Sequence, residues 1–296
     1  MGSQNSLRVF EEAVAIVTGG TSGIGRALAE ALARRKATVV LAGLEIDLAR
    51  DVAAGIRAAG GQATPAFVDV REFASVQELV QATWREHGRL DYMFNNAGIG
   101  IGGPVREYQI EDWYSVLDVN LRGVVHGVQA AYPLMLRQGF GHIVNTASMA
   151  GLVPTPGTVG YAASKFGVVG LSISLRAEAA AAGVRVSVLC PGVIRTPILE
   201  GGKHGKSLLP IPPEVQRRYW ERLRPMAPER FAAKVLPAIR KNRAIIIVPS
   251  WWKIFWWINR ISPSLGLFIS RKLYEKSMRE LEKYSSSGTQ SLERDR

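Results

Sequence analysis

Cysteine and histidine are both scarce in this chain of 296 residues. Cys190 is the only cysteine, which excludes a disulfide within one chain, and we interpret it as a small buried packing residue. The four histidines show no metal-ligand spacing and are interpreted as structural or solvated: His87, His126, His142 and His204. The polar first ten residues show no signal peptide. We therefore expect a cytoplasmic protein without a metal site.

Acidic residues are few in only one part of the chain. Residues 1–200 hold 17 basic and 17 acidic side chains, whereas residues 201–243 hold 11 and 3, and residues 244–283 hold 7 and 3. The net charge of +12 therefore lies in residues 201–283. Such an asymmetry indicates an anionic partner surface, either a membrane or a nucleic acid.

Short apolar runs recur along the chain, and hydrophobic residues make up 47% of it, enough for a full core. Seven runs are expected to be buried strands: Ala13–Val17, Thr38–Leu41, Ala63–Val68, Leu90–Phe94, His142–Asn145, Arg185–Leu189 and Ala244–Val248. Helical patterns lie between them, such as the stripe of Val76, Leu79, Val80 and Trp84. The alternation predicts an α/β fold, a doubly wound parallel sheet with helices on both faces.

A glycine-rich segment, Thr18–Gly25, follows the first predicted strand and opens the first predicted helix. Gly19, Gly23 and Gly25 allow a tight turn and close backbone approach to a ligand. The free N–H groups at the start of the helix favour a pyrophosphate there. Because the glycine spacing differs from the usual dinucleotide fingerprint, a glycine-rich turn without a ligand is the alternative.

Tyr161 and Lys165 are four residues apart in a segment that is typical of a helix, so both side chains lie on one helix face. An ammonium beside a phenol favours the phenolate, which makes the tyrosine a usable acid and base near neutral pH. Alone, the pair is weak evidence for catalysis, because a tyrosine on a helix usually lies at the edge of the core. Ser148, thirteen residues upstream, and the glycine-rich segment strengthen it.

Six ordered motifs together resemble the short-chain dehydrogenase/reductase family, in its single-domain branch. They are Thr18-Gly19-x3-Gly23-x-Gly25, Asn95-Asn96-Ala97-Gly98, Asn120, Ser148, Tyr161-x3-Lys165 and Pro191-Gly192-x3-Thr196. The resemblance implies a Rossmann domain with a seven-stranded sheet over residues 12–250, after an N-terminal tail at 1–11. It also implies a mobile substrate lid at 197–228. Residues 251–296 remain as a C-terminal helical extension outside the family pattern.

The resemblance also implies the reaction, a hydride transfer between a nicotinamide and a secondary alcohol or its ketone. Tyr161 would be the acid and base, and Lys165 would lower its pKa and hold the nicotinamide ribose. Ser148 would donate a hydrogen bond to the substrate oxygen. Asn120 would hold a relay water near Lys165. A non-catalytic dinucleotide sensor attached to membranes is the rival interpretation.

The cofactor would be NAD or NADP. The residues that the family pattern assigns to it, besides Tyr161 and Lys165, are Gly19, Thr21, Ser22, Gly23, Ile24, Gly25, Gly43, Leu44, Asp69, Val70, Asn96, Ala97, Gly98, Pro191, Gly192, Val193, Ile194 and Thr196. Asp69 would contact the adenine ring, although a polar strand-end cap explains it as well. Gly43 stands where NAD-preferring relatives have an aspartate, and Leu44 and Ser22 stand where NADP-preferring relatives have a basic residue. The preference therefore stays open, with Glu45 or Asp47 as candidates for the acidic role.

The extension begins with five aromatic residues within positions 251–257, flanked by Lys253 and Arg260. Pro263 and these charges prevent a run of the roughly 20 apolar residues that a spanning helix needs. A Trp-rich apolar face with basic flanks suits a headgroup boundary, so we expect peripheral membrane contact through residues 251–273, on the inner face of a membrane. Packing against the domain or a second subunit is the alternative, and nucleic acid is not expected. We further expect a lipophilic substrate and a homo-oligomer, a dimer or tetramer.

Overall fold

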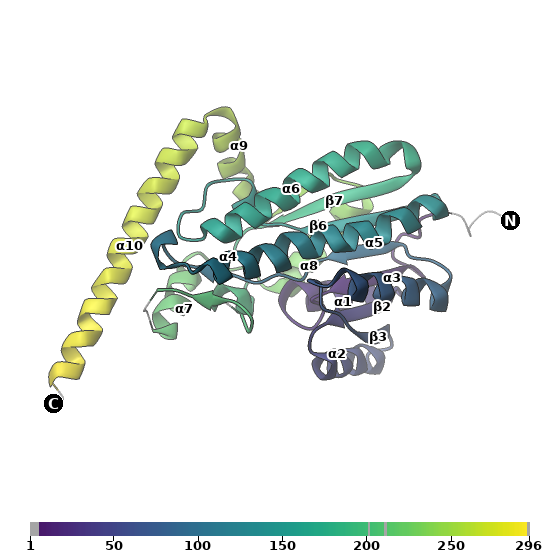
Figure 1. Cartoon of the computed structure of the whole chain (residues 1–296), viewed down its shortest axis with the longest axis horizontal. Coiled ribbons are helices and arrows are strands. Elements are labelled where there is room, and N and C mark those ends of the chain that lie inside the picture. Colours follow the sequence, from purple (N-terminus) through teal and green to yellow (C-terminus); the bar gives the residue numbers. More distant parts are fainter. Residues whose placement is uncertain (1–5, 201, 210–211, 295–296) are drawn as a thin grey trace.

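The protein, described here from a computed structural model covering residues 6–200, 202–209 and 212–294, is built around one seven-stranded parallel sheet. The strand order is β3–β2–β1–β4–β6–β7–β9 (Figure 1). The strands are β1 Val14–Thr18, β2 Thr38–Gly43, β3 Gln62–Phe67, β4 Tyr92–Asn95, β6 Gly141–Thr146, β7 Val184–Pro191 and β9 Ile245–Val248. The doubly wound sheet predicted from the sequence is confirmed, with each strand within two residues of its expected position.

Helices cover both faces of the sheet (Figure 1). One face packs against α1 Gly23–Ala33, α2 Ile46–Ala58 and α8 Pro228–Arg240. The other packs against α3 Phe73–His87, α5 Gly123–Gln138 and α6 Val159–Ala179. The predicted stripe on α3 buries Val76, Leu79 and Val80, whereas Trp84, also part of that stripe, is 43% exposed.

Strands β1 and β4 are neighbours, and the chain runs outward from them in both directions. The order of strands therefore reverses between β1 and β4. In doubly wound sheets, ligands bind outside the carboxyl ends of the strands at this point. The segments that follow β1, β4, β6 and β7 all meet there, which positions the site described below.

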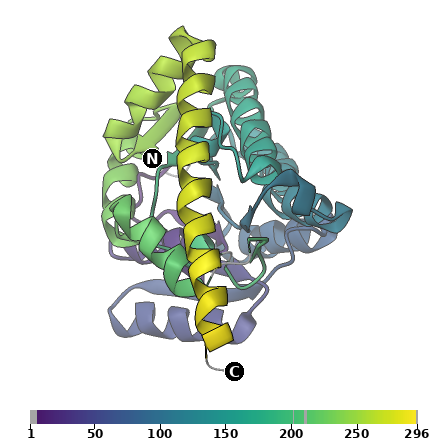
Figure 2. The same cartoon turned by 90° about the vertical axis from the view of Figure 1, so that its left-hand side faces the viewer.

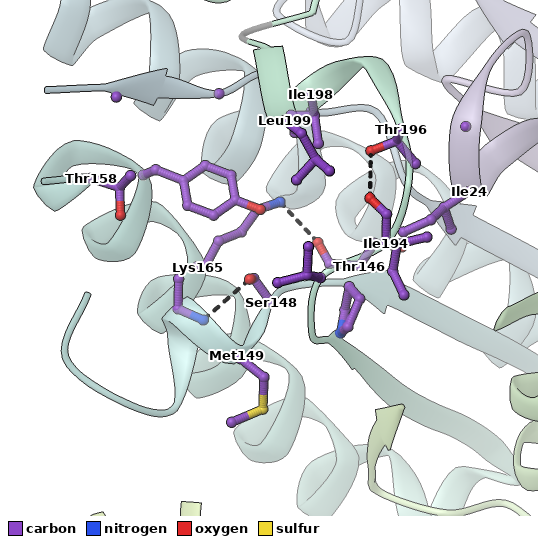
Figure 3. Close-up of a pocket in the computed structure, with 18 of the residues that line it drawn as sticks. Ile24, Thr146, Ser148, Met149, Thr158, Lys165, Ile194, Thr196, Ile198 and Leu199 are labelled. Carbon is purple, nitrogen blue, oxygen red and sulfur yellow. Dashed lines mark hydrogen bonds between the residues drawn. The ribbon is translucent and has the colours of Figure 1, made fainter. Parts of the chain in front are cut away.

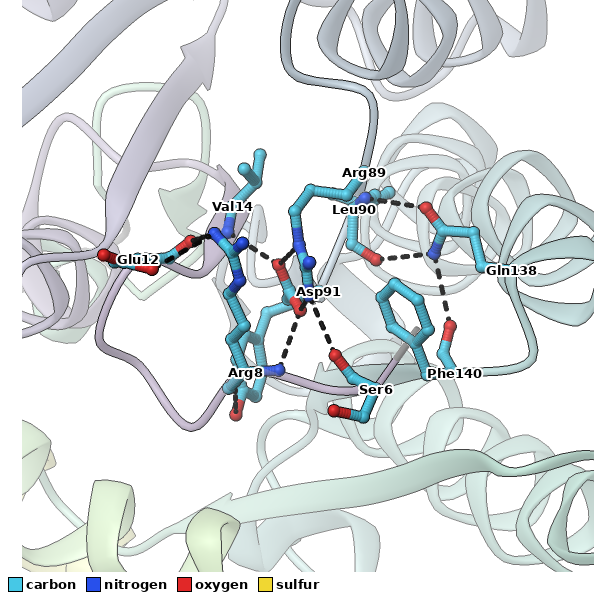
Figure 4. A network of polar contacts seen from close by, with 10 residues as sticks. Ser6, Arg8, Glu12, Val14, Arg89, Leu90, Asp91, Gln138 and Phe140 are labelled. Carbon is cyan, nitrogen blue, oxygen red and sulfur yellow. Dashed lines mark hydrogen bonds and ion pairs between the residues drawn. The ribbon is translucent and has the colours of Figure 1, made fainter. Parts of the chain in front are cut away.

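The segment predicted as an N-terminal tail is attached to the sheet from Ser6 onward; residues 1–5 lie outside the described part of the chain. Figure 4 shows the buried carboxylate of Asp91 accepting hydrogen bonds from the backbone N–H groups of Arg8 (3.0 Å) and Val14 (2.9 Å). The guanidinium of Arg89 pairs with the same carboxylate at 2.6 Å and donates to the Ser6 carbonyl oxygen. Asp91 thus joins the start of the chain to β4.

The described part of the predicted lid contains the 3-10 helix Pro197–Glu200, the short strand β8 Lys206–Ser207 and the helix α7 Pro213–Arg222. β8 pairs with β5 Ile101–Gly102, a two-stranded sheet that the sequence did not predict. The C-terminal extension forms a helical hairpin of α9 Lys253–Ile261 and α10 Pro263–Arg294, separated where Pro263 was expected to interrupt the aromatic segment. α10 lies across the end of the sheet at which the carboxyl ends of the strands meet (Figures 1 and 2). In the part of the chain that the structure describes, no helix is long and apolar enough to cross a membrane.

Candidate active site

A cavity of about 390 Å³ lies at the carboxyl ends of the central strands. Its walls come from the glycine-rich segment after β1, the segments after β4, β6 and β7, the start of α6, and the lid. Ser148, Tyr161 and Lys165 all line it. The three residues on which the predicted chemistry depends are therefore brought to one place from β6 and α6.

Tyr161 and Lys165 lie one turn apart near the start of α6, as their spacing predicts. Lys165 is 2% exposed, and its Nζ donates a hydrogen bond of 3.0 Å to the Thr146 carbonyl oxygen (Figure 3). The same Nζ lies 5.5 Å from the centroid of the Tyr161 ring. The ammonium is thus held between the tyrosine and the end of β6.

Ser148 begins the short helical turn Met149–Gly151 after β6, and its Oγ accepts a hydrogen bond of 3.1 Å from the Ala150 N–H. This hydrogen bond makes Ser148 the cap of the turn. Its side chain nevertheless lines the cavity, and its hydrogen bond to the Tyr161 hydroxyl lowers the pKa of that phenol. Ser148 thus has a structural role and a place beside Tyr161.

Burial has the largest effect on the pKa values of Tyr161 and Lys165. It raises the pKa of Tyr161 despite the opposing effect of Ser148. It lowers the pKa of Lys165 from 10.5 to about 8, because the charged form loses its hydration. The sequence predicted that Lys165 lowers the pKa of Tyr161; in this structure the ammonium instead bonds the Thr146 carbonyl, and the phenol is stabilised in its neutral form. Cys190 lies nearby, fully buried, and burial raises the pKa of its thiol, as suits a packing residue.

Asn120 is fully buried in a π-helical turn, Asp118–Arg122, that links α4 Ile110–Leu117 to α5. Its Oδ1 accepts from the Ile99 N–H at 2.8 Å, and its Nδ2 donates to the Ile99 carbonyl oxygen at 3.0 Å and to Ser164 Oγ at 3.2 Å. It does not line the cavity itself. A Cβ at Gly98 would lie 3.2 Å from Asn120 Oδ1 and 3.5 Å from Lys165 Nζ, so Asn120 and Lys165 approach the same glycine after β4.

The glycine-rich segment forms a backbone cradle at the start of α1. Gly19 and Gly23 have positive φ angles of 63° and 50°. A Cβ at Gly25 would lie only 2.1 Å from the Gly19 carbonyl oxygen, so no larger residue fits there. Thr18 Oγ1 accepts from the N–H groups of Asn96 and Ala97 at 3.0 and 3.1 Å and joins this cradle to the segment after β4. A glycine-lined wall at a helix N-terminus fits the pyrophosphate of a dinucleotide.

The remaining predicted cofactor residues fall into two groups. Those that line the cavity are Gly19, Ser22, Gly23, Ile24, Asn96, Ala97, Gly98, Pro191, Gly192, Val193, Ile194 and Thr196. Those outside it are Thr21, Gly25, Gly43, Leu44, Asp69 and Val70. Asp69 pairs with Arg71 at 2.6 Å, which lowers the pKa of its carboxyl, and Glu45 pairs with Lys203 of the lid.

Several lining residues were not predicted from the sequence. Trp252 packs so closely against Gly192 that a Cβ there would lie 2.1 Å from Trp252 Nε1. Trp220 and Leu223, at the end of α7, form another part of the wall. The aromatic content of positions 251–257 marked Trp252 as unusual, but only the folded chain shows that it contacts the segment after β7.

A sequence profile described as short chain dehydrogenase matches residues 13–206. This chain belongs to the short-chain dehydrogenase/reductase family. A solved short-chain dehydrogenase/reductase from Burkholderia phymatum, in complex with NAD, is 33% identical with a TM-score of 0.78, over 87% of this chain and 96% of that one. Levodione reductase is 31% identical with a TM-score of 0.73, over 81% of this chain and 96% of that one.

Curated relatives agree with this assignment. A Staphylococcus epidermidis protein named as an oxidoreductase is 35% identical over 199 residues, which are 66% of this chain and 84% of the relative. A Mycobacterium tuberculosis protein named "Probable oxidoreductase EphD" is 36% identical over 86% of this chain and 44% of its own length. The protein is thus an NAD(P)-dependent oxidoreductase, with NAD or NADP as its cofactor.

Proposed function

We propose that this dehydrogenase interconverts a lipophilic secondary alcohol and its ketone. The observation that carries this proposal is the composition of the cavity beyond Tyr161. Apolar side chains surround the polar group there: Met149, Val153, Ile198, Leu199, Trp220 and Trp252. Such walls favour an apolar substrate body, while the hydroxyls of Ser148 and Tyr161 fix its oxygen.

In this mechanism Tyr161 holds the proton that moves. Its phenol accepts the hydroxyl proton of an alcohol or donates a proton to a carbonyl oxygen, while Ser148 donates a hydrogen bond to the same oxygen. A bound nicotinamide supplies the hydride donor or acceptor. Lys165 places a positive charge beside the phenol as it loses its proton, and Asn120 bonds the backbone of Ile99 and the hydroxyl of Ser164, the residue before that lysine.

The activity is tested with purified protein and a series of secondary alcohols of increasing hydrocarbon length. Titration with NADH and with NADPH, followed by fluorescence, first selects the cofactor. We expect kcat/KM to rise with hydrocarbon length, because each buried CH₂ contributes about 0.8 kcal/mol. A preference for polyols over apolar alcohols of the same size would contradict the proposed substrate class.

We further propose that the α9–α10 hairpin contacts a membrane peripherally. Seven exposed apolar residues of the hairpin and of the turn before it form what we call the apolar tip: Trp251, Ile254, Trp257, Ile261, Leu265, Leu267 and Phe268. Ile254, Trp257 and Ile261 lie on one face of α9, and Ile261 is 79% exposed. Exposed cations flank the tip at Lys253, Arg260 and Arg271. Aromatic and basic residues around an apolar face suit the headgroup region of an anionic bilayer.

Flotation with anionic vesicles tests this contact. Ile261→Asp should reduce the bound fraction strongly, whereas Ile110→Asp, at an exposed isoleucine at the start of α4, serves as the matched control and should float like the wild type. Equal flotation of both variants would contradict the role of the tip.

A homo-oligomer is proposed on a separate surface. Exposed apolar side chains lie along α5 and α6: Val125, Leu136, Phe166 and Ile173. Light scattering of wild type and of Phe166→Asp should give a larger mass for the wild type. A monomer at all concentrations would exclude this assembly.

A further inference from the structure

The part of α10 beyond the apolar tip runs past the end of the sheet at which the strands have their carboxyl ends (Figure 2). None of its described residues lines the cavity itself. It contacts two segments that each contribute to the cavity wall: the segment after Ser148, which supplies Thr155 and Thr158, and α7, which supplies Trp220. We call residues 274–280 of α10 the strap, because it joins these two segments.

On one wall, the ring of Tyr274 lies against Gly157, where a Cβ would approach its Cε2 to 3.2 Å. On the other wall, Ser277 Oγ lies 3.1 Å from the Tyr219 hydroxyl, and Glu280 pairs with Arg222 at 2.8 Å. These are one ring contact, one hydrogen bond and one exposed ion pair. Such surface contacts are individually weak.

The root of the hairpin is held more firmly than the strap. Gly266 is buried against Asn259, where a Cβ would lie 2.4 Å from Asn259 Oδ1. Asn259 Nδ2 in turn donates to the Leu152 carbonyl oxygen at 3.2 Å. Trp252 is fixed against Gly192 on the other side. Movement of the strap therefore does not require α9 to leave the domain.

The outer face of the strap and of the turn before it is basic. Arg271, Lys272, Lys276 and Arg279 are all exposed. Among the side chains that the structure describes, the acidic partner of this group is Glu275, which lies within 3.3 Å of Arg271 and Lys272 and within 3.9 Å of Arg279. One carboxylate cannot neutralise four cations, so this described part of the outer face keeps a positive charge that attracts anionic lipid.

We propose that the strap closes the substrate opening in solution and is released when an anionic bilayer binds its outer basic residues. The inference rests on the peripheral membrane contact proposed above and adds its consequence for the active site. The partner is the lipid surface, and a lipophilic substrate then enters the cavity from the side that faces the bilayer.

A thiol on the segment that the strap contacts reports its release without any need for turnover. Cys190 is fully buried, so the native chain gives a low background of labelling. Thr155→Cys places a thiol on the cavity wall, where the Thr155 hydroxyl is buried without a hydrogen-bond partner in the described part of the chain. Val153→Cys is a second reporter on the same wall, used if the first variant does not fold.

We expect vesicles containing phosphatidylglycerol to raise the maleimide labelling rate on the order of tenfold, and phosphatidylcholine vesicles to leave it unchanged. Adding Tyr219→Phe and Glu280→Gln to the cysteine variant removes two contacts of the strap, so labelling should be fast without vesicles. Adding Lys276→Gln and Arg279→Gln should weaken the response to vesicles while flotation through the apolar tip persists.

Flotation of the same samples separates the two proposals. If the protein floats but the labelling rate stays constant, the strap proposal is overturned and membrane contact stands. If the protein does not float, both are overturned. Labelling that slows with rising protein concentration and ignores vesicles would show that a second copy of the chain covers the strap, which also overturns it.

Discussion

The ammonium group of Lys165 lies 3.0 Å from the Thr146 carbonyl oxygen and 5.5 Å from the centre of the Tyr161 ring. The first contact joins α6 to the end of β6, and the second places a positive charge beside the phenol. Burial lowers the pKa of this lysine to about 8, so the folded protein destabilises the charged form relative to the neutral form. The site therefore holds a charge that the fold itself disfavours.

The lowered pKa of Lys165 predicts that stability depends on pH. The unfolded chain keeps the Lys165 proton up to about pH 10.5, whereas the folded chain loses it near pH 8. Between these values the unfolded state binds more protons, so the free energy of unfolding should rise with pH, by up to about 3 kcal/mol. Urea unfolding at pH 7.5 to 10.5 should show this rise in the wild type and lose it in Lys165→Met. Parallel curves for the two proteins would contradict the assigned burial.

His142 predicts a second effect, at acid pH. It is fully buried on β6, its Nε2 bonds Ser187 Oγ at 2.9 Å, and burial lowers its pKa from 6.5 to about 3. Because the unfolded chain takes up this proton below about pH 6.5 and the folded chain does not, stability should fall as the pH drops toward 3. The slope is about 1.4 kcal/mol for each pH unit. His142→Gln should show a shallower decline between pH 6.5 and 4.5 in thermal or urea unfolding, and an unchanged slope would refute this assignment.

The glycine cradle predicts a contrast between two small substitutions. At Gly25 a Cβ would meet the Gly19 carbonyl oxygen at 2.1 Å, whereas at Gly55, on α2, a Cβ would meet nothing within 4 Å. Gly25→Ala should distort the loop and weaken NADH or NADPH binding at least about tenfold, which corresponds to about 1.4 kcal/mol. Gly55→Ala is the matched control and should bind nearly as the wild type does. Fluorescence titration measures both, and equal affinity would argue against the cradle as the cofactor site.

Asn120 predicts a structural loss that also reaches the site. Its amide makes three buried hydrogen bonds, to the Ile99 N–H, the Ile99 carbonyl oxygen and Ser164 Oγ. Asn120→Ala leaves those partners unsatisfied, so it should destabilise the protein by about 1–3 kcal/mol. It should also lower kcat, because it removes the hydrogen bond to Ser164, the residue before Lys165. Thermal unfolding and kinetics on the same sample check both effects; full activity with lowered stability would reduce Asn120 to a structural residue.

The sequence predicted the strands and the residues around Tyr161 more fully than it predicted the connecting turns and the C-terminal extension. The strands were found because each is a buried apolar run, and Tyr161, Lys165 and Ser148 were found because local spacing places them on α6 and after β6. The π-helical turn at Asn120 could not be foreseen, because it depends on contacts with Ile99 and Ser164 that are distant in sequence.

The same reason explains what was missed at the substrate side. Trp252 lines the cavity only because the extension folds back onto Gly192, and Trp84 is exposed although its position in the α3 stripe fits a core residue. The raised pKa of Tyr161 was also unforeseen. Side-chain spacing showed that Lys165 was near, but not that its ammonium bonds Thr146.

The most direct test is Tyr161→Phe, which removes one hydroxyl from the cavity and keeps the ring. With a secondary alcohol that the wild type oxidises, kcat should fall by about 10²–10⁴, the range for loss of a positioned acid and base. The affinity for NADH or NADPH should stay within a few fold, because the glycine cradle is unchanged. Turnover at the wild-type rate by a variant that still binds its dinucleotide would contradict the role of the phenol.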